Sequence, residues 1–70
     1  MDNQAMRILN YIKKHGSITN MDAFRDLGIT RLSGRIYDLR EAGYNITMTW
    51  ETSEHGTRYG RFYLEGDTNG

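Results

Sequence analysis

Apolar residues in the first part of the chain recur at the spacing of one helical face. This period predicts an amphipathic helix over about residues 3–15, with Asp2 or Asn3 as its N-cap. Basic residues at 13–15 suit the negative end of the helix dipole, and Gly16 suits the left-handed position that ends a helix. The residues of the apolar face, at i, i+3, i+4 and i+7, are Ala5, Ile8, Leu9 and Ile12.

Two short elements are predicted next. Residues 17–19 include two β-branched side chains and predict one brief edge strand. Asn20 is then expected to cap a helix over about residues 21–27. Gly28, followed by apolar Ile29, predicts a Schellman-type end to that helix. Three of its apolar residues share a face and a fourth lies beside it: Met21, Phe24 and Leu27, with Ala23.

A third helix is predicted over Arg31–Ala42, with Thr30 as its cap and Gly43 at its end. Only residues 28–30 connect it to the preceding helix. Two helices joined by so short a turn containing glycine cross steeply, which is the geometry of a helix-turn-helix. The apolar residues expected to face inward from the third helix are Leu32, Ile36 and Leu39.

After Gly43 the pattern changes to the alternation of a β-strand, with apolar residues at Ile46, Met48 and Trp50. A polar stretch of about six residues, 52–57, separates this segment from a returning strand over residues 58–64. The two strands predict a β-hairpin. We therefore expect one α+β domain over residues 1–64. The remaining residues, 65–70, contain no apolar side chain and predict a flexible polar tail.

Composition narrows the possible functions. Seventy residues suffice for one small domain, and with 37% apolar residues a second copy of the chain is a candidate source of further burial. The absence of cysteine excludes disulfides and thiol chemistry, and two histidines are a poor zinc set. No catalytic motif is present, so we expect no enzyme activity and no cofactor. Nothing suggests a signal peptide or a membrane span, and a cytoplasmic location is expected.

The order of elements is that of a winged helix-turn-helix, a three-helix core with a short strand after the first helix and a C-terminal hairpin wing. Residues 7–46 resemble the small winged helix-turn-helix proteins of phages and prophages. The most specific part is "GITRLSGRIYDLREAGYNI", residues 28–46, in which cap, helix, glycine and first wing strand follow one another. The resemblance implies double-stranded DNA binding, with the third helix in the major groove and the wing on the adjacent backbone or minor groove.

Each candidate DNA contact has an alternative structural role. Arg31 and Arg35 can reach guanine edges or phosphates, but Arg35 can instead pair with Asp38 at helical spacing. Tyr37 can contact a phosphate or pack half-buried beside the inward stripe. The full set of candidate DNA contacts is Arg31, Ser33, Gly34, Arg35, Tyr37 and, in the wing, Arg58.

The net charge of zero keeps a second class of function open. Residues 1–16 are mildly basic, residues 17–43 are balanced, and residues 44–70 are mildly acidic, so strong nonspecific DNA binding is not expected. The alternative is a protein-interaction module of a phage or mobile element that binds and inhibits or redirects a host defence or nucleic-acid enzyme. Trp50 is expected either in the core or, with Tyr59 or Tyr63, in an exposed partner interface, and a homodimer is possible.

Overall fold

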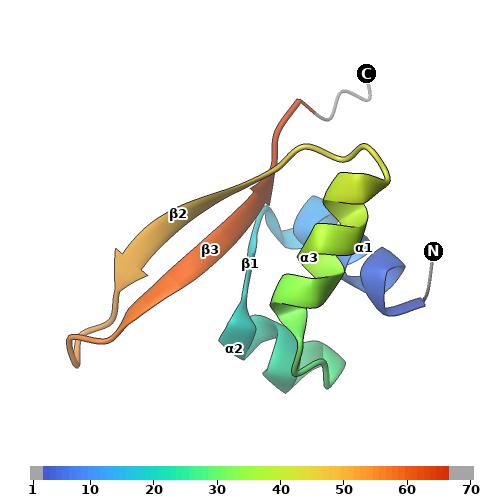
Figure 1. The fold of residues 1–70 in the computed structure, drawn as a ribbon. Coiled ribbons are helices and arrows are strands. Elements are labelled where there is room, and N and C mark those ends of the chain that lie inside the picture. The colour runs from blue at the N-terminus through green and yellow to red at the C-terminus, as the bar shows by residue number, and fades with distance from the viewer. Residues whose placement is uncertain (1–2, 67–70) are drawn as a thin grey trace.

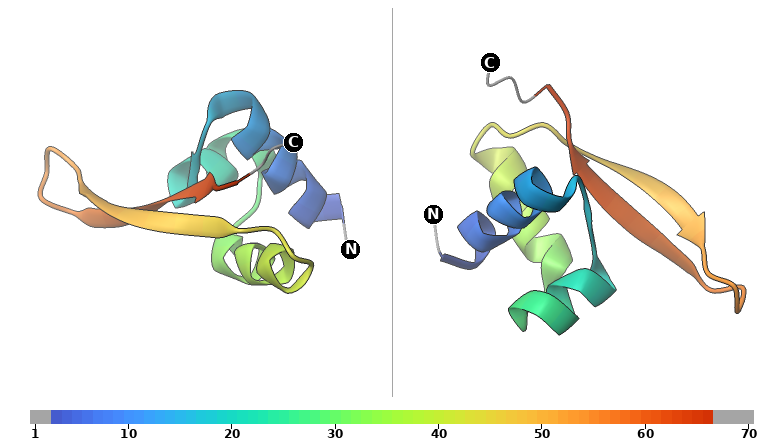
Figure 2. Two further views of the ribbon diagram at one scale, coloured as in Figure 1. Left: turned by 90° about the horizontal axis from the view of Figure 1, so that it is seen from above. Right: turned by 180° about the vertical axis from the view of Figure 1, so that it is seen from behind.

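A computed structural model describes residues 3–66 and shows the expected α+β architecture (Figure 1). Helices gather on one side of a small antiparallel sheet, and the hairpin extends well past them, as the two further views in Figure 2 show. The elements in chain order are α1 (Asn3–His15), β1 (Ile18–Thr19), α2 (Asn20–Asp22), η1 (Ala23–Leu27), α3 (Leu32–Glu41), β2 (Ile46–Thr52) and β3 (Arg58–Leu64).

The core lies between α1, α3 and the base of the sheet. The predicted inward faces of α1 and α3 are confirmed, because every residue assigned to them is buried. Half-buried Phe62 and Leu64 of β3 pack against this cluster. The buried hydrophobic residues are Ala5, Ile8, Leu9, Ile12, Ile18, Ala23, Ile29, Leu32, Ile36, Leu39 and Ile46.

The second helix differs from the sequence prediction in its cap. Thr19, not Asn20, is the N-cap, since its backbone is still extended while Asn20 is already helical. The Thr19 hydroxyl accepts a hydrogen bond from the Asp22 amide at 3.1 Å, and the Asp22 carboxylate accepts one from the Thr19 amide at 3.1 Å. This reciprocal capping box satisfies two backbone donors that the helix itself leaves unpaired.

From Ala23 onward the same helix widens into the π-helical turn η1. Ala23, its first residue, is fully buried, whereas Met21 and Phe24, which the sequence places on one face, are 65% and 61% exposed. The predicted glycine ending is confirmed. Gly28 has a φ of +69°, and the Ile29 amide donates to the Ala23 carbonyl at 3.0 Å.

The third helix is one residue shorter at each end than predicted. Its N-cap is Arg31 rather than Thr30, and no side chain bonds the first turn at this cap. The backbone of Arg31 lies outside the helical region, which delays the helix to Leu32. Gly43 follows the helix with a φ of +105°, as the sequence predicts.

The sheet order is β1-β3-β2, and both pairings are antiparallel. β1 opposes only Arg61 and Phe62, whereas β2 pairs with β3 along its whole length. Because Thr52 belongs to β2, the wing loop is Ser53–Thr57, one residue shorter than predicted. Of the predicted tail, Glu65 donates its amide to the Asn45 carbonyl at 2.8 Å, and residues 67–70 lie outside the described part of the chain.

Candidate nucleic-acid interface

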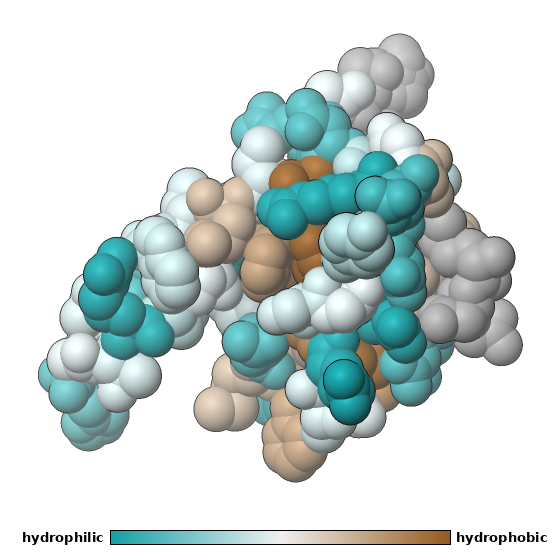
Figure 3. Space-filling model, viewed as in Figure 1, coloured by the Kyte–Doolittle hydropathy of each residue, from teal (hydrophilic) through white to brown (hydrophobic). Residues whose placement is uncertain are grey.

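The outward face of α3 is free of packing contacts over much of its length. Inward-pointing Leu32, Ile36 and Leu39 leave the side chains between them directed to solvent. Arg31, at the start of the helix, and Ser33 are exposed, and Tyr37 is 62% exposed. The half-buried packing role considered for Tyr37 is therefore wrong. Figure 3 shows hydrophilic side chains over the face of α3 turned to the viewer and over the hairpin tip.

Arg35 adopts the structural alternative that its spacing allowed. Its Nε lies 3.0 Å from Oδ2 of Asp38, one helical turn onward, and its side chain is only partly exposed. This pairing limits the positive charge that Arg35 can offer a phosphate. It also neutralises the carboxylate of Asp38, which would otherwise repel a phosphate at this face.

Gly34 leaves room on α3 for a close neighbour. A Cβ atom added at this position would meet no heavy atom within 4 Å apart from its chain neighbours and the backbone of its own helix. Gly34 is thus not required by the packing of the domain itself. A glycine on an outward helical face allows another molecule's backbone to approach closely.

The wing presents its arginine on an aromatic platform. Arg58, the first residue of β3, lies with its Cζ 4.9 Å from the ring centroid of Trp50. A guanidinium over an indole face is held by a cation–π attraction worth about 0.5–1 kcal/mol when exposed. In the loop, the Ser53 hydroxyl accepts hydrogen bonds from the amides of His55 and Thr57. These contacts order the tip from which Arg58 projects.

The acidic residue of β2 lies on the other face of the hairpin. Residues opposite each other in an antiparallel pair point to the same face, so Glu51 shares a face with Tyr59 and Arg61. Glu51 accepts hydrogen bonds from the Tyr59 hydroxyl and from Arg61 Nε, both at 2.9 Å. The Arg61 guanidinium lowers the pKa of Glu51, and the carboxylate in turn raises the pKa of Arg61. Glu51 therefore does not neutralise the charge of Arg58.

The same register divides the residues of the predicted aromatic interface between the two faces of the hairpin. Trp50 is 59% exposed, so the alternative that placed it in the core is wrong. Tyr59 and Tyr63 oppose Glu51 and Thr47, on the face away from Trp50. The three residues named together from the sequence do not form one patch. A crevice of about 540 Å³ lies on the Tyr59 side, between that face and the first turn of α2.

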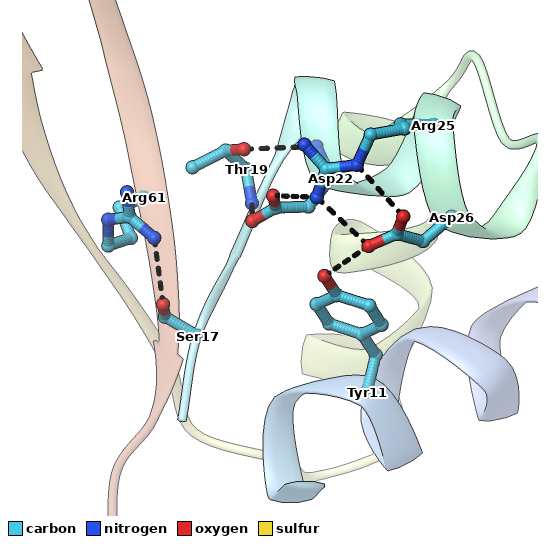
Figure 4. A network of polar contacts seen from close by, with 7 residues as sticks. All are labelled: Tyr11, Ser17, Thr19, Asp22, Arg25, Asp26 and Arg61. Atoms are coloured by element: carbon cyan, nitrogen blue, oxygen red, sulfur yellow. Dashed lines mark hydrogen bonds and ion pairs between the residues drawn. The ribbon is translucent and has the colours of Figure 1, made fainter. Parts of the chain in front are cut away.

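A network that the sequence analysis missed fixes η1 against α1 (Figure 4). The Tyr11 hydroxyl donates to Asp26 Oδ2 at 2.6 Å, and Arg25 bridges Asp26 and Asp22 at 2.9 and 3.0 Å. Hydrogen bonds from Arg25 and Tyr11 lower the pKa of Asp26 to about 2, and the Asp26 carboxylate raises the pKa of Tyr11. The Asp22–Arg25 spacing was readable as a helical ion pair, but the contact to Tyr11 spans 15 residues and had no local signal.

Residues 3–66 contain no cluster of three or more histidine, aspartate or glutamate side chains placed to bind a metal ion. In the same range, none of the helices has both the length and the apolar character needed to span a membrane.

The three-helix core, the tight turn and the projecting hairpin together define a winged helix-turn-helix. The family model described as a winged helix-turn-helix domain matches residues 3–65, and the chain belongs to this family. Comparison with curated proteins and with solved structures gave no match.

Proposed function

We propose that this protein binds double-stranded DNA through the outward face of α3 and the wing. The observation that carries the proposal is the unpacked face of α3, which presents Arg31, Ser33 and Tyr37 to solvent. In the helix-turn-helix mode of binding, the residues near the start of the recognition helix, here α3, meet base edges in the major groove. Arg31 stands at that start.

The wing supports a second contact. Arg58 is oriented by Trp50 on the hairpin face opposite to Glu51, so no carboxylate of β2 competes for it. Arginine is the side chain best suited to a phosphate pair or to a narrow minor groove. Asp38 and Glu51 are each paired with an arginine of the domain. This pairing reduces the repulsion between these carboxylates and the phosphates of DNA.

Fluorescence anisotropy with a labelled mixed-sequence duplex at low salt tests the proposal. Wild type is expected to bind, and Arg31→Ala is expected to cost about 1–3 kcal/mol for a base contact or to lower the salt slope by about 1 for a phosphate contact. Arg7→Ala, which removes an arginine of α1 that is also exposed, is the matched control and is expected to change little. Absence of binding by wild type, or equal losses in the two variants, would contradict the proposal.

For the role in the cell, we propose a small transcription regulator or accessory DNA-binding factor of a phage or prophage. The support is the resemblance of residues 28–46 to such proteins. Selection of a bound site from a random duplex pool tests the regulatory role. We expect a defined sequence to be enriched, and enrichment of no sequence would contradict a site-specific regulator.

Protein binding is a second candidate function, favoured by the exposure of Met21 and Phe24 one turn apart on α2 and η1. Exposed apolar side chains of this size mark surfaces that other proteins cover. In this reading the partner is a host defence or nucleic-acid enzyme that the protein inhibits or redirects. A stoichiometric complex with one such enzyme, lost in Phe24→Ala and retained in Arg31→Ala, would support it. Recovery of nucleic acid alone would contradict it.

A further inference from the structure

The outer edge of β2 carries backbone groups that no strand within residues 3–66 pairs with. The Ser53 amide donates to the Thr57 carbonyl, and the Glu65 amide donates to the Asn45 carbonyl, both at 2.8 Å. These bonds flank the hairpin at odd-numbered residues. Since hydrogen-bonded and non-hydrogen-bonded pairs alternate in an antiparallel ladder, the odd residues of β2 bond to β3 and the even residues point outward.

One of these outward groups is already occupied. Arg40, near the end of α3, donates from Nε to the Ile46 carbonyl at 3.0 Å. The open edge therefore begins after Ile46 and consists of the amides and carbonyls of Met48, Trp50 and Thr52. An edge strand of this length is normally protected by lysine, proline or a bulge. β2 has none of these, and its one charged residue, Glu51, is paired with Arg61 within the hairpin.

The side chains on this edge are apolar and exposed as well. Met48 and Trp50 are 37% and 59% exposed and lie on the same face of the hairpin. Beyond the three-helix core this face has no covering element, because the hairpin projects away from the helices (Figure 2). The edge thus combines free backbone hydrogen-bonding groups with two large apolar side chains.

We propose that a second copy of the chain pairs with this edge, β2 against β2 in antiparallel orientation, about a two-fold axis at Thr49. The strand is complementary to itself in this register. Met48 of each copy lies opposite Trp50 of the other, so both exposed side chains are buried in sulfur–aromatic contacts. The outward amides and carbonyls of these two residues pair across the axis, as an isologous interface requires.

The opposite face of the strand also accepts this register. Thr49 lies opposite Thr49 of the second copy, a pairing of β-branched residues that suits a sheet. Glu51 lies opposite Thr47 rather than opposite a second glutamate. Shifting the register by one residue would place outward groups against groups already bonded to β3. The dimer has a continuous sheet of order β1-β3-β2-β2-β3-β1, and its formation does not depend on DNA.

Cysteine cross-linking tests the proposal directly, because the chain has no cysteine of its own. In the proposed register Thr49 forms a non-hydrogen-bonded pair with its own copy, with Cα atoms about 4.5 Å apart, a separation that a disulfide can bridge. Thr49→Cys is expected to form a covalent dimer under mild oxidation. Thr47→Cys places the same thiol on the same face and strand but far from its symmetry mate, and is expected to stay monomeric.

A charge placed on the apolar pair gives a second measurement. Met48→Lys is expected to abolish cross-linking of Thr49→Cys, whereas Met21→Lys, the same change at a more exposed methionine outside the edge, is expected to leave it intact. Circular dichroism checks that both variants fold. In wild type, the emission of the single tryptophan is expected to shift to shorter wavelength as concentration rises.

Three results would overturn the proposal: cross-linking of Thr47→Cys as efficient as that of Thr49→Cys, a monomer by sedimentation at all concentrations, or capture of the edge by another protein's strand in place of a second copy. These readouts contain no DNA, so failure of the proposed DNA binding leaves them unchanged.

Discussion

Two glycines, one at the end of η1 and one within α3, have different roles. Gly28 has a φ of +69°, a conformation that costs an L-residue about 1–2 kcal/mol, and it ends the preceding helix. Gly34 lies inside α3, where no neighbouring atom requires the absence of a side chain. The first glycine is needed by the fold, and the second is available for a role in binding.

Substitution by alanine should separate the two roles. Gly34→Ala is expected to stabilise the domain by about 0.5–1 kcal/mol, because glycine loses more backbone entropy than alanine in a helix. Gly28→Ala is expected to destabilise it by about 1–2 kcal/mol. Urea denaturation measures both changes. A destabilised Gly34→Ala would show that the helix needs this glycine for packing.

The same variant bears on the interface. If DNA approaches the backbone of α3 at Gly34, then Gly34→Ala should bind the duplex more weakly although it is more stable. Anisotropy titration beside the denaturation curve shows whether the two effects diverge. Unchanged affinity would remove Gly34 from the contact surface.

At the scale of elements, the sequence predicts what local periodicity and capping determine. The buried faces of α1 and α3 are visible in the spacing of apolar residues, and the change to a two-residue period in the sequence marks the strand β2. The π-helical turn η1 is not visible in this way, because no spacing of apolar residues distinguishes it from the α-helix that the sequence predicts over residues 21–27. Pairing across the hairpin is equally hidden, so Trp50 and Tyr59 were grouped although the register places them on opposite faces.

The network of Tyr11, Asp26 and Arg25 between α1 and η1 predicts that the stability of the fold falls at acid pH. A carboxyl whose pKa is lower in the folded than in the unfolded state stabilises the fold above its unfolded pKa, and this contribution is lost as the pH falls through the folded pKa. For Asp26 that window runs from about pH 4 down to about pH 2. Asp26→Asn should therefore show a flatter loss of stability over this window.

Urea denaturation at several pH values within the window measures the effect. Tyr11→Phe, which removes one hydrogen bond but leaves the Arg25 pair, should keep most of the wild-type slope. Some slope should also remain in Asp26→Asn, since the pKa of Glu51 is lowered too. Superimposable profiles for wild type and Asp26→Asn would contradict the assignment.

At the scale of the whole molecule, the distribution of charge matters more than its sum. The chain carries nine basic and nine acidic residues, yet the carboxylates of Asp22, Asp26, Asp38 and Glu51 are held by arginines within the domain. Arg31 and Arg58 are exposed at the start of α3 and at the wing. The positions of the candidate DNA contacts on α3 and in the wing could be predicted from the sequence, because chain order sets these positions in a winged helix-turn-helix. The contacts of these residues within the domain could not be predicted, since Arg35 and Trp50 each had more than one possible role.

The most direct test of the central claim is an amide NMR titration with duplex DNA. The chain contains no proline, so every residue after the first carries a backbone amide that can be followed. The account predicts that the largest shifts fall on residues 31–38 and on the wing residues 53–58. Shifts confined to α1 or to the crevice beside α2, or no shifts at low salt, would contradict DNA binding through α3 and the wing.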